Sequence, residues 1–251
     1  MLIFRRIFNF EQDKVEQLEK RLNLRYALGP DFPLQATLHY SGRDYFPKVI
    51  DISSNGVGVM VPPGTALAAG YHLRLALVLG PHRLEIDARI AHVNIREEGI
   101  DLGLGLVFGD FEVQKSFMQL MQPVVIGQSL QLMPAQRVIQ DEPQFTKQAF
   151  FGEPDSLLTV RAEKTPGQPL HSFDFRMYDY YCRGIMQKGQ ADAYPLESMD
   201  PYGAKLNNPV FETSGGLHDE IHQLFRWVVP NLTNAIPDNV REFLKKFAGK
   251  A

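Results

Sequence analysis

Two arginines near the N-terminus have the spacing to hold one anionic ligand together. Arg21 and Arg25 lie four residues apart, so both guanidinium groups reach one side of a helical turn or a hooked linker. A guanidinium can pair with phosphate oxygens through two donors, stack on a purine, or match the O6 and N7 acceptors of guanine. The R-x-x-x-R string is therefore compatible with a ligand that carries phosphate and purine groups. Taken alone the string is common, and a solvated helix face is its simpler interpretation.

A short acidic turn further along the chain supplies complementary groups. Asp51, Ser53 and Gly56 form the string D-x-S-x-x-G. The Asp51 carboxylate can accept hydrogen bonds from guanine N–H groups or orient a nearby arginine, and the Ser53 hydroxyl can donate to phosphate. Asn55-Gly56 permits a positive φ, so a tight turn with backbone N–H groups facing an anion is expected. A plain β-turn in which Asp or Ser bonds its own backbone is the competing interpretation.

The residues around this turn predict an antiparallel barrel or sandwich. Between Phe32 and Phe108 apolar and polar residues alternate over short stretches, separated by turn dipeptides such as Ser41-Gly42 and Gly80-Pro81. No helical pattern interrupts these stretches, which is typical of an all-β unit. Six strands are expected, at residues 34–40, 46–52, 58–61, 71–79, 84–90 and 102–107, and a helix is expected to follow at residues 111–122.

The first 24 residues predict helix. Ile3, Phe4, Ile7 and Phe8 would share one face, opposite Arg5 and Arg6. An amphipathic helical lead over residues 1–18 that packs on its own domain is the simpler interpretation. Basic amphipathic segments also dock on partner proteins or on membrane surfaces, and both remain alternatives here.

Residues 123–251 predict a small α+β domain. Two strands are expected at residues 157–162 and 172–177, because apolar residues alternate there around a turn rich in Pro and Gly. Residues 186–216 are rich in Gly, Pro, Asn and Asp and predict a loop. Helices are expected at residues 216–229 and 238–247, the second of which begins with an acidic first turn after Pro237. No activity is assigned to this domain.

An enzyme or metal site in this C-terminal half is a weaker alternative. His218 and His222 are spaced to share one helical face, and His171 and Asp174 are available as further ligands. Asp219 stands where the zinc-protease pattern requires Glu, so a polar helix face is the simpler interpretation. Cys182 lies in an aromatic run and is expected to be a buried core thiol, not a nucleophile. No metal site and no catalytic residue is predicted.

Composition narrows the class of protein. A hydrophobic share of 44% with 22% charged residues is ordinary for a folded chain. The net charge of −3 gives no general attraction to DNA or RNA, so an anionic ligand needs a local cluster of basic residues. One cysteine forms no intrachain disulfide and fits a reducing compartment. No secretory signal pattern and no spanning apolar segment is evident, so a cytoplasmic location is expected.

With the motifs and the strands together, residues 19–122 resemble a PilZ domain. The stretch Asp51–Val59 (DISSNGVGV) resembles the second motif of that family and the strand after it. The stretch Leu102–Phe108 (LGLGLVF), followed by an acidic turn and a helix, resembles the closing strand and terminal helix. Residues 26–33 form a longer step into the first strand than is usual in the family.

The resemblance implies a six-stranded antiparallel PilZ-type β-barrel that binds cyclic di-GMP as a bacterial second-messenger receptor. Arg21 and Arg25 would contact phosphate and guanine, while Asp51, Ser53 and Gly56 would form the barrel side of the site. The whole chain is then mainly β with α: a helical lead at 1–18, a barrel at 19–122 and an α+β domain at 123–251. A signalling receptor without enzymatic activity or cofactor is predicted, with a protein partner at the N-terminal helix or C-terminal domain. A PilZ-fold interaction module that binds no nucleotide is the alternative.

Overall fold

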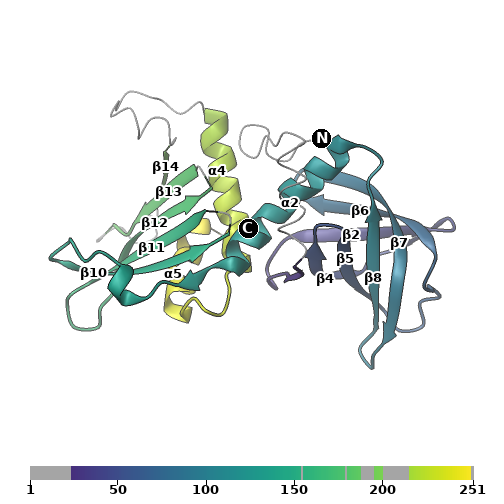
Figure 1. Cartoon of the computed structure of the whole chain (residues 1–251), viewed down its shortest axis with the longest axis horizontal. Coiled ribbons are helices and arrows are strands. Elements are labelled where there is room, and N and C mark those ends of the chain that lie inside the picture. Colours follow the sequence, from purple (N-terminus) through teal and green to yellow (C-terminus); the bar gives the residue numbers. More distant parts are fainter. Residues whose placement is uncertain (1–23, 154, 179, 188–194, 200–214, 250–251) are drawn as a thin grey trace. The chain divides into compact units, whose positions relative to one another are not determined.

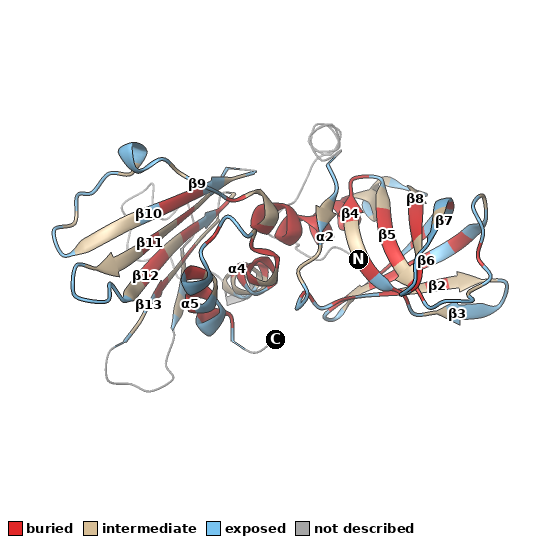
Figure 2. Cartoon of the chain, turned by 90° about the horizontal axis from the view of Figure 1, so that it is seen from below, coloured by how far each residue is buried: buried red, intermediate tan, exposed pale blue. Residues whose placement is uncertain are grey.

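The computed structural model describes residues 24–153, 155–178, 180–187, 195–199 and 215–249. The helix expected over residues 1–24 falls outside this part of the chain, except for Leu24. The chain divides into two compact units, Met1–Gln122 and Pro123–Ala251. Each unit contains a β-sheet in which buried and more exposed residues alternate along the strands, as Figure 2 shows. The protein is mainly β.

The first unit contains an eight-stranded antiparallel sheet that curls into a half-barrel (Figure 1). The strand order is β1-β4-β5-β8-β7-β6-β2-β3. The strands are β1 (Tyr26–Ala27), β2 (Leu34–Tyr40), β3 (Arg43–Tyr45), β4 (Lys48–Ser53), β5 (Gly56–Val61), β6 (His72–Leu79), β7 (His82–Ile95) and β8 (Ile100–Val107).

The expected count of six strands in this unit is wrong, because two further short strands pair at the ends of the sheet. All six expected strands are present, although β5 begins two residues early, at Gly56, and β7 extends to Ile95. The additional strands, β1 and β3, have two and three residues, too few to show an alternating pattern in sequence. β1 is the more consequential, because it occupies the long step at residues 26–33 and pairs with β4.

The core of the first unit lies on the inner face of this sheet. Leu38, Leu75 and Ile52 are completely buried there, as alternation in their strands predicts. Helix α2 (Phe111–Ser129) follows β8, and its start is capped where the Val113 N–H donates to Asp110 Oδ1 at 2.8 Å. The helix was expected to end at residue 122 but continues through Pro123. Apolar residues beyond the proline explain this, since Val124, Val125 and Ile126 are fully buried.

The second unit contains a six-stranded antiparallel sheet with helices on one face (Figure 1). The strand order is β14-β13-β12-β11-β10-β9. The strands are β9 (Gln131–Leu132), β10 (Phe145–Gly152), β11 (Ser156–Glu163), β12 (Leu170–Met177), β13 (Tyr180–Ile185) and β14 (Leu196–Met199). The helices are α4 (Gly215–Val228) and α5 (Asp238–Ala248), with short 3-10 turns η1 (Ala135–Arg137) and η2 (Val229–Asn231).

Sequence reasoning found two of these six strands and both helices. β14 lies inside the expected loop of residues 186–216, so that part of the prediction is wrong, while residues 188–194 and 200–214 fall outside the described chain. The helices are held to the sheet by aromatic contacts. The Phe173 ring stacks on Phe225 at 5.3 Å and meets the edge of Phe247 at 5.1 Å. Within the described residues, no helix is both long and apolar enough to cross a membrane.

Candidate functional site

Asp51 lies on the hairpin formed by β4 and β5. The pair Ser53 and Gly56 closes this hairpin around a two-residue turn, Ser54-Asn55. The register of β4 shifts between Val49 and Asp51, which is the signature of a β-bulge. Val49 and Ile52 are both buried, so the bulge leaves Asp51 on the outer face of the sheet with 25% of its side chain exposed.

Arg25 reaches Asp51 because β1 is pinned along the free edge of β4. Tyr26 pairs with Ile52, Ala27 pairs with Asp51, and the Leu28 N–H donates to the Ile50 carbonyl at 3.0 Å. The Arg25 Nη1 then lies 3.4 Å from Asp51 Oδ1, with 56% of the Arg25 side chain exposed. An ion pair this open to water contributes little to stability, so both groups can exchange partners at low cost. Arg21, the other predicted arginine, lies outside the described residues.

The glycines of the hairpin make room for side chains and for a neighbouring strand. A Cβ on Gly58 would lie 2.7 Å from both carboxylate oxygens of Asp51, so only glycine lets the carboxylate rest over β5. A Cβ on Gly56 would lie 3.0 Å from the Leu104 carbonyl oxygen. Neither Asn55 nor Gly56 has a positive φ, which corrects the reason expected for this glycine. Close approach to β8 explains it instead.

The Ser53 hydroxyl lies inside the turn. Ser53 is 6% exposed, and its Oγ is 3.3 Å from the Gly56 carbonyl oxygen and 3.5 Å from Asn55 Oδ1. Both distances are long for an O–H donor, so these bonds are weak. Ser53 therefore bonds within its own turn, as the simpler interpretation expects. Its hydroxyl could still donate to a ligand, because a stronger acceptor could displace either contact.

A pocket of about 730 Å³ opens beside this hairpin, and its lining includes both the outward-facing Asp51 and buried residues such as Val49 and Leu102. Two of the predicted residues, Arg25 and Asp51, line it. Sequence reasoning missed the polar side chains that neighbouring strands and the loop between β7 and β8 add to the lining: Lys48, His92, Asn94, Arg96, Glu98 and Asp101. Their signal was the polar side of the alternation in the strands, which marks a face but not which residues on that face meet.

His92 enters the pocket because β7 also carries a bulge. The pairing of β7 with β8 shifts between Ile90 and His92. The His92 ring lies over Gly103, since a Cβ there would fall 1.9 Å from the ring carbon Cε1. The His92 ring on β7 and the Asp51 carboxylate on β4 thus lie at two sides of the pocket.

The basic residues of the pocket differ in how firmly they are paired. Arg96 Nε lies 2.5 Å from Asp101 Oδ2, with 64% of the Arg96 side chain exposed. Lys48 makes no ion pair with any residue the structure describes. Together with Arg25, these residues give the pocket three cationic side chains in a chain of negative net charge. Asp51, Glu98 and Asp101 balance these charges, so Lys48 is the cation of the described lining that is available to an anionic ligand.

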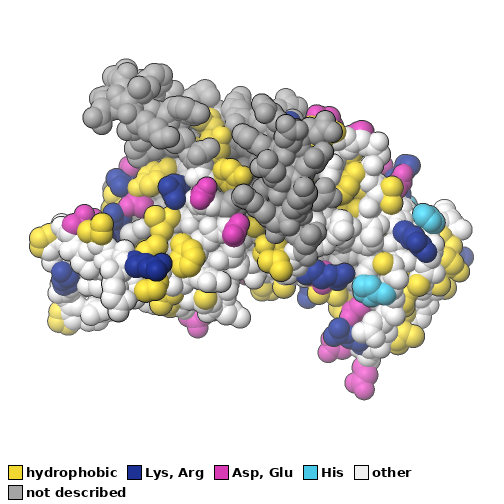
Figure 3. Space-filling model, in the orientation of Figure 1, with side chains coloured by type: hydrophobic (Ala, Val, Ile, Leu, Met, Phe, Trp, Pro, Cys, Tyr) yellow, Lys and Arg dark blue, Asp and Glu magenta, His cyan; other side chains and the backbone are white. Residues whose placement is uncertain are grey.

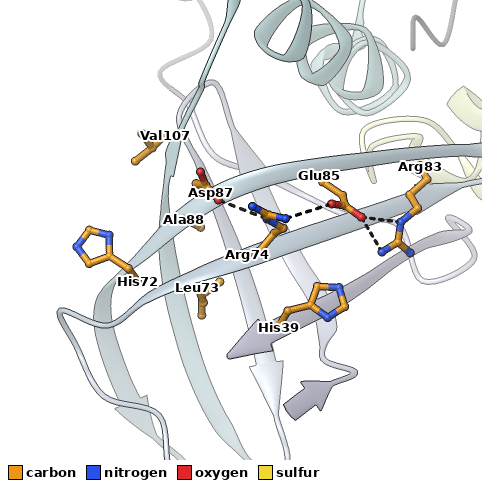
Figure 4. A pocket seen from close by; sticks show the side chains of 9 residues that line it. All are labelled: His39, His72, Leu73, Arg74, Arg83, Glu85, Asp87, Ala88 and Val107. Carbon is orange, nitrogen blue, oxygen red and sulfur yellow. Dashed lines mark hydrogen bonds and ion pairs between the residues drawn. The ribbon is translucent and has the colours of Figure 1, made fainter. Parts of the chain in front are cut away.

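A second hollow, of about 790 Å³, lies on the outer face over β2, β6 and β7 and contains none of the predicted residues (Figure 4). Arg74 bridges Glu85 at 3.8 Å and Asp87 at 3.6 Å, and Arg83 pairs with Glu85 at 3.0 Å. Its arginines are already matched by carboxylates. Although this hollow is slightly larger, the pocket at the hairpin is better suited to an anion, because Lys48 in its lining makes no ion pair with the described residues.

The residues of the alternative metal site do not assemble. His218 and His222 are neighbours, with ring centroids 3.9 Å apart, and the His218 Nδ1 contacts the Ser198 hydroxyl. His171 stacks on Phe145 instead, and Asp174 is bound by arginines. In the part of the chain that the structure describes, no group of three or more His, Cys, Asp or Glu residues could hold a metal ion.

Cys182 is a core thiol, as expected. Its side chain is completely buried, and burial raises the pKa of the thiol well above its ordinary value. A thiol in this state is a poor nucleophile, because the thiolate is the reactive form. Among the described residues, then, the outer face of the first sheet offers the best-formed candidate site.

The PilZ domain family model matches residues 19–122. No curated relative matches the chain. One similar solved structure is the PilZ domain of YcgR from Escherichia coli with c-di-GMP, at 13% identity and a TM-score of 0.34, covering 39% of this chain and 85% of that one. Another is PlzA from Borreliella burgdorferi in complex with c-di-GMP, at 10% identity and a TM-score of 0.34, covering 83% and 98%.

Proposed function

Residues 19–122 form a PilZ domain, and we propose that this domain is a receptor for cyclic di-GMP. The observation that supports the proposal best is the contact between Arg25 and Asp51 beside the pocket of about 730 Å³. The two predicted strings are far apart in sequence, and β1 brings the ends of both together. The ion pair is exposed to solvent and its N–O distance is long, so Arg25 and Asp51 can each give up the other as a partner and bind a ligand instead.

Each predicted residue has a role in this proposal. Arg25, with Arg21, pairs with phosphate oxygens or the O6 and N7 acceptors of a guanine. Asp51 accepts hydrogen bonds from guanine N–H groups and keeps Arg25 near the pocket when ligand is absent. Ser53 donates to phosphate, and Gly56 allows the hairpin to lie close against β8. His92 offers a ring on which a base can stack.

The receptor carries no catalytic step in this proposal. Ligand binding changes what the domain presents to a protein partner, through the N-terminal helix or the second unit. The described lining of the pocket has three carboxylates and three cationic side chains, but no hydroxyl or thiol side chain that an adjacent base could activate.

Isothermal titration calorimetry with cyclic di-GMP tests the proposal on the full chain. Wild-type protein should bind with micromolar or better affinity. Arg25→Ala should weaken binding by about 30-fold, because one charge-assisted contact is worth about 1.5–3 kcal/mol. Arg21→Ala should have a similar effect and leave the fold unchanged.

Arg83→Ala is the matched control, because Arg83 is an exposed arginine of the same sheet that pairs with Glu85 outside the proposed site. Its affinity should equal that of the wild type. If the wild-type protein gave no binding heat with cyclic di-GMP at concentrations 100-fold above the micromolar range, the domain would instead be a PilZ-fold interaction module. Loss of binding in Arg83→Ala with retention in Arg25→Ala would move the site to the second hollow.

A further inference from the structure

Four glycines form a strip without side chains across the centre of the outer sheet face. On β5, Gly56 and Gly58 pair with Gly105 and Gly103 of β8. Each glycine pair belongs to a row of residues that runs across four strands. The first row ends in Asp51 and His92, and the second row ends in Ser53 and Arg89.

In the first row, the side chains of the two end residues already occupy the space above the glycines. The Asp51 carboxylate lies where a Gly58 side chain would be, and the His92 ring lies where a Gly103 side chain would be. Both glycines are explained by the need to admit these side chains.

The second row is open over Gly105. A Cβ on Gly105 would meet one described atom within 4 Å, the Arg89 carbonyl oxygen at 3.9 Å. No described side chain occupies the space above it, and no positive φ demands a glycine there. Neither crowding nor backbone conformation among the described residues therefore explains Gly105, in contrast to Gly58 and Gly103.

Arg89 is an available cation at the end of this open row. It is exposed on β7 and makes no ion pair with the described residues. Arg83, six residues earlier on the same strand, is held by Glu85 through both Nε and Nη2 at 3.0 Å. The cross-strand neighbours of Arg89 are His72 and Gly105, neither of which is acidic.

We propose that Arg89 and Ser53 form a phosphate subsite over Gly105. This inference rests on the proposed binding of cyclic di-GMP, and it assigns the ligand phosphate that lies away from Arg25. Three interstrand steps of about 4.8 Å separate the backbones of Ser53 and Arg89 by roughly 14 Å. A phosphate between the hydroxyl and the long guanidinium side chain bridges this gap, with the bare backbone of Gly105 beneath it.

Calorimetry on three variants of the full chain tests the subsite. Arg89→Ala should weaken cyclic di-GMP binding by about 10-fold or more, since a charge-assisted contact is lost, and Arg89→Lys should recover part of it as a point charge. Gly105→Ala should fold normally, because its Cβ meets ordinary contact distances, yet weaken binding by occupying the phosphate space. Arg83→Ala should bind as the wild type does.

A ³¹P NMR spectrum of the bound ligand distinguishes a phosphate contact from a base contact. Two phosphates in different surroundings give two resonances, and Arg89→Ala should shift one of them and leave the other in place. Wild-type affinity in both Arg89→Ala and Gly105→Ala would overturn the subsite while leaving the receptor proposal intact. Equal losses in Arg89→Ala and Arg83→Ala would also overturn it, since a general charge effect would then suffice. Failure of the wild type to bind would remove the receptor proposal itself.

Discussion

Each sheet carries an Arg–Asp contact, and the two contacts differ in the number of partners, in distance and in exposure. In the first sheet Asp51 has one arginine partner at 3.4 Å, and the Arg25 side chain is 56% exposed. In the second sheet Asp174 has two, Arg161 at 2.5 Å and Arg183 at 2.6 Å. Asp174 is only 13% exposed. One contact is an open pair and the other is a saturated cluster.

In the second sheet, the neighbouring side chains fully hydrogen-bond the Asp174 carboxylate. Burial disfavours the charged form of Asp174, but hydrogen bonds from Arg183, Tyr181 and Arg161 outweigh it and hold the Asp174 pKa below its ordinary value. Burial and the Asp174 carboxylate raise the pKa of Tyr181, so its hydroxyl remains a donor. Every group in the cluster already has a partner, so a ligand would have to break strong contacts to enter.

The difference suggests how charged groups on a sheet can be divided between structure and binding. Figure 3 shows basic and acidic side chains interspersed over the described surface that is visible in the orientation of Figure 1, so charge alone does not mark a site. A binding group must be held near its position yet remain unsatisfied. Arg25 meets that description, whereas Arg161 and Arg183 do not.

The largest effect should come from removing the centre of the saturated cluster. Asp174→Ala leaves two half-buried arginines without their shared carboxylate, which should lower the free energy of unfolding of the second unit by about 3 kcal/mol. The chain contains one tryptophan, Trp227 of α4, and it is 4% exposed. Urea unfolding followed by tryptophan fluorescence therefore reports on the second unit.

Asp51→Ala is the matched change in the first sheet. Its loss should alter unfolding of the chain by less than about 0.5 kcal/mol, measured by circular dichroism, because an exposed pair contributes little. The same variant should lose cyclic di-GMP affinity, while Asp174→Ala should retain it. Equal destabilisation by the two variants would erase the distinction between the contacts.

A glycine from each sheet gives a smaller and more specific comparison. A Cβ on Gly184 would lie 2.3 Å from the Phe173 ring and 2.6 Å from Phe247, so Gly184→Ala should overpack the core and lower the unfolding free energy by about 1–3 kcal/mol. A Cβ on Gly58 meets the free end of the Asp51 side chain, which can swing away. Gly58→Ala should therefore leave stability nearly unchanged and weaken ligand binding by about 10-fold. Fluorescence-detected unfolding and calorimetry on both variants would separate the two outcomes, and a large stability loss in Gly58→Ala would contradict them.

The sequence revealed the two halves of the candidate site but not what joins them. Alternation located the six longer strands of the first sheet and hence the outward side of the hairpin. β1 was not predicted because two residues are too few to show a periodic pattern, and it is the strand that places Arg25 beside Asp51. The bulges at Ile50 and Ala91 were not predicted either. They reverse which residues face outward, so His92 could not be assigned to the pocket from spacing alone.

In the second unit the sequence underestimated the sheet for a related reason. The aromatic run at β13 was recognised as core material, but a strand was not expected there, and β14 lies in a stretch with the composition of a loop. Both strands are defined by pairing with neighbours distant in sequence. Likewise, His171 and Asp174 were candidate ligands for a site with His218, and the register of β12 placed them in other contacts.

The stability of the second unit should also depend on pH, without any change of sequence. Burial, followed by the nearby His218 and Arg226, lowers the pKa of His222 to about 4. The unfolded chain binds a proton near pH 6.5, where folded His222 stays neutral, so stability is full above that pH and falls as the pH drops toward 4. With allowance for the solvent that reaches this half-buried ring, the loss at pH 5 should be about 1 kcal/mol. Urea midpoints from Trp227 fluorescence at pH 7.5 and pH 5 measure it, and His222→Gln should remove that part of the difference. An unchanged pH dependence in the variant would show that His222 is not the titrating group.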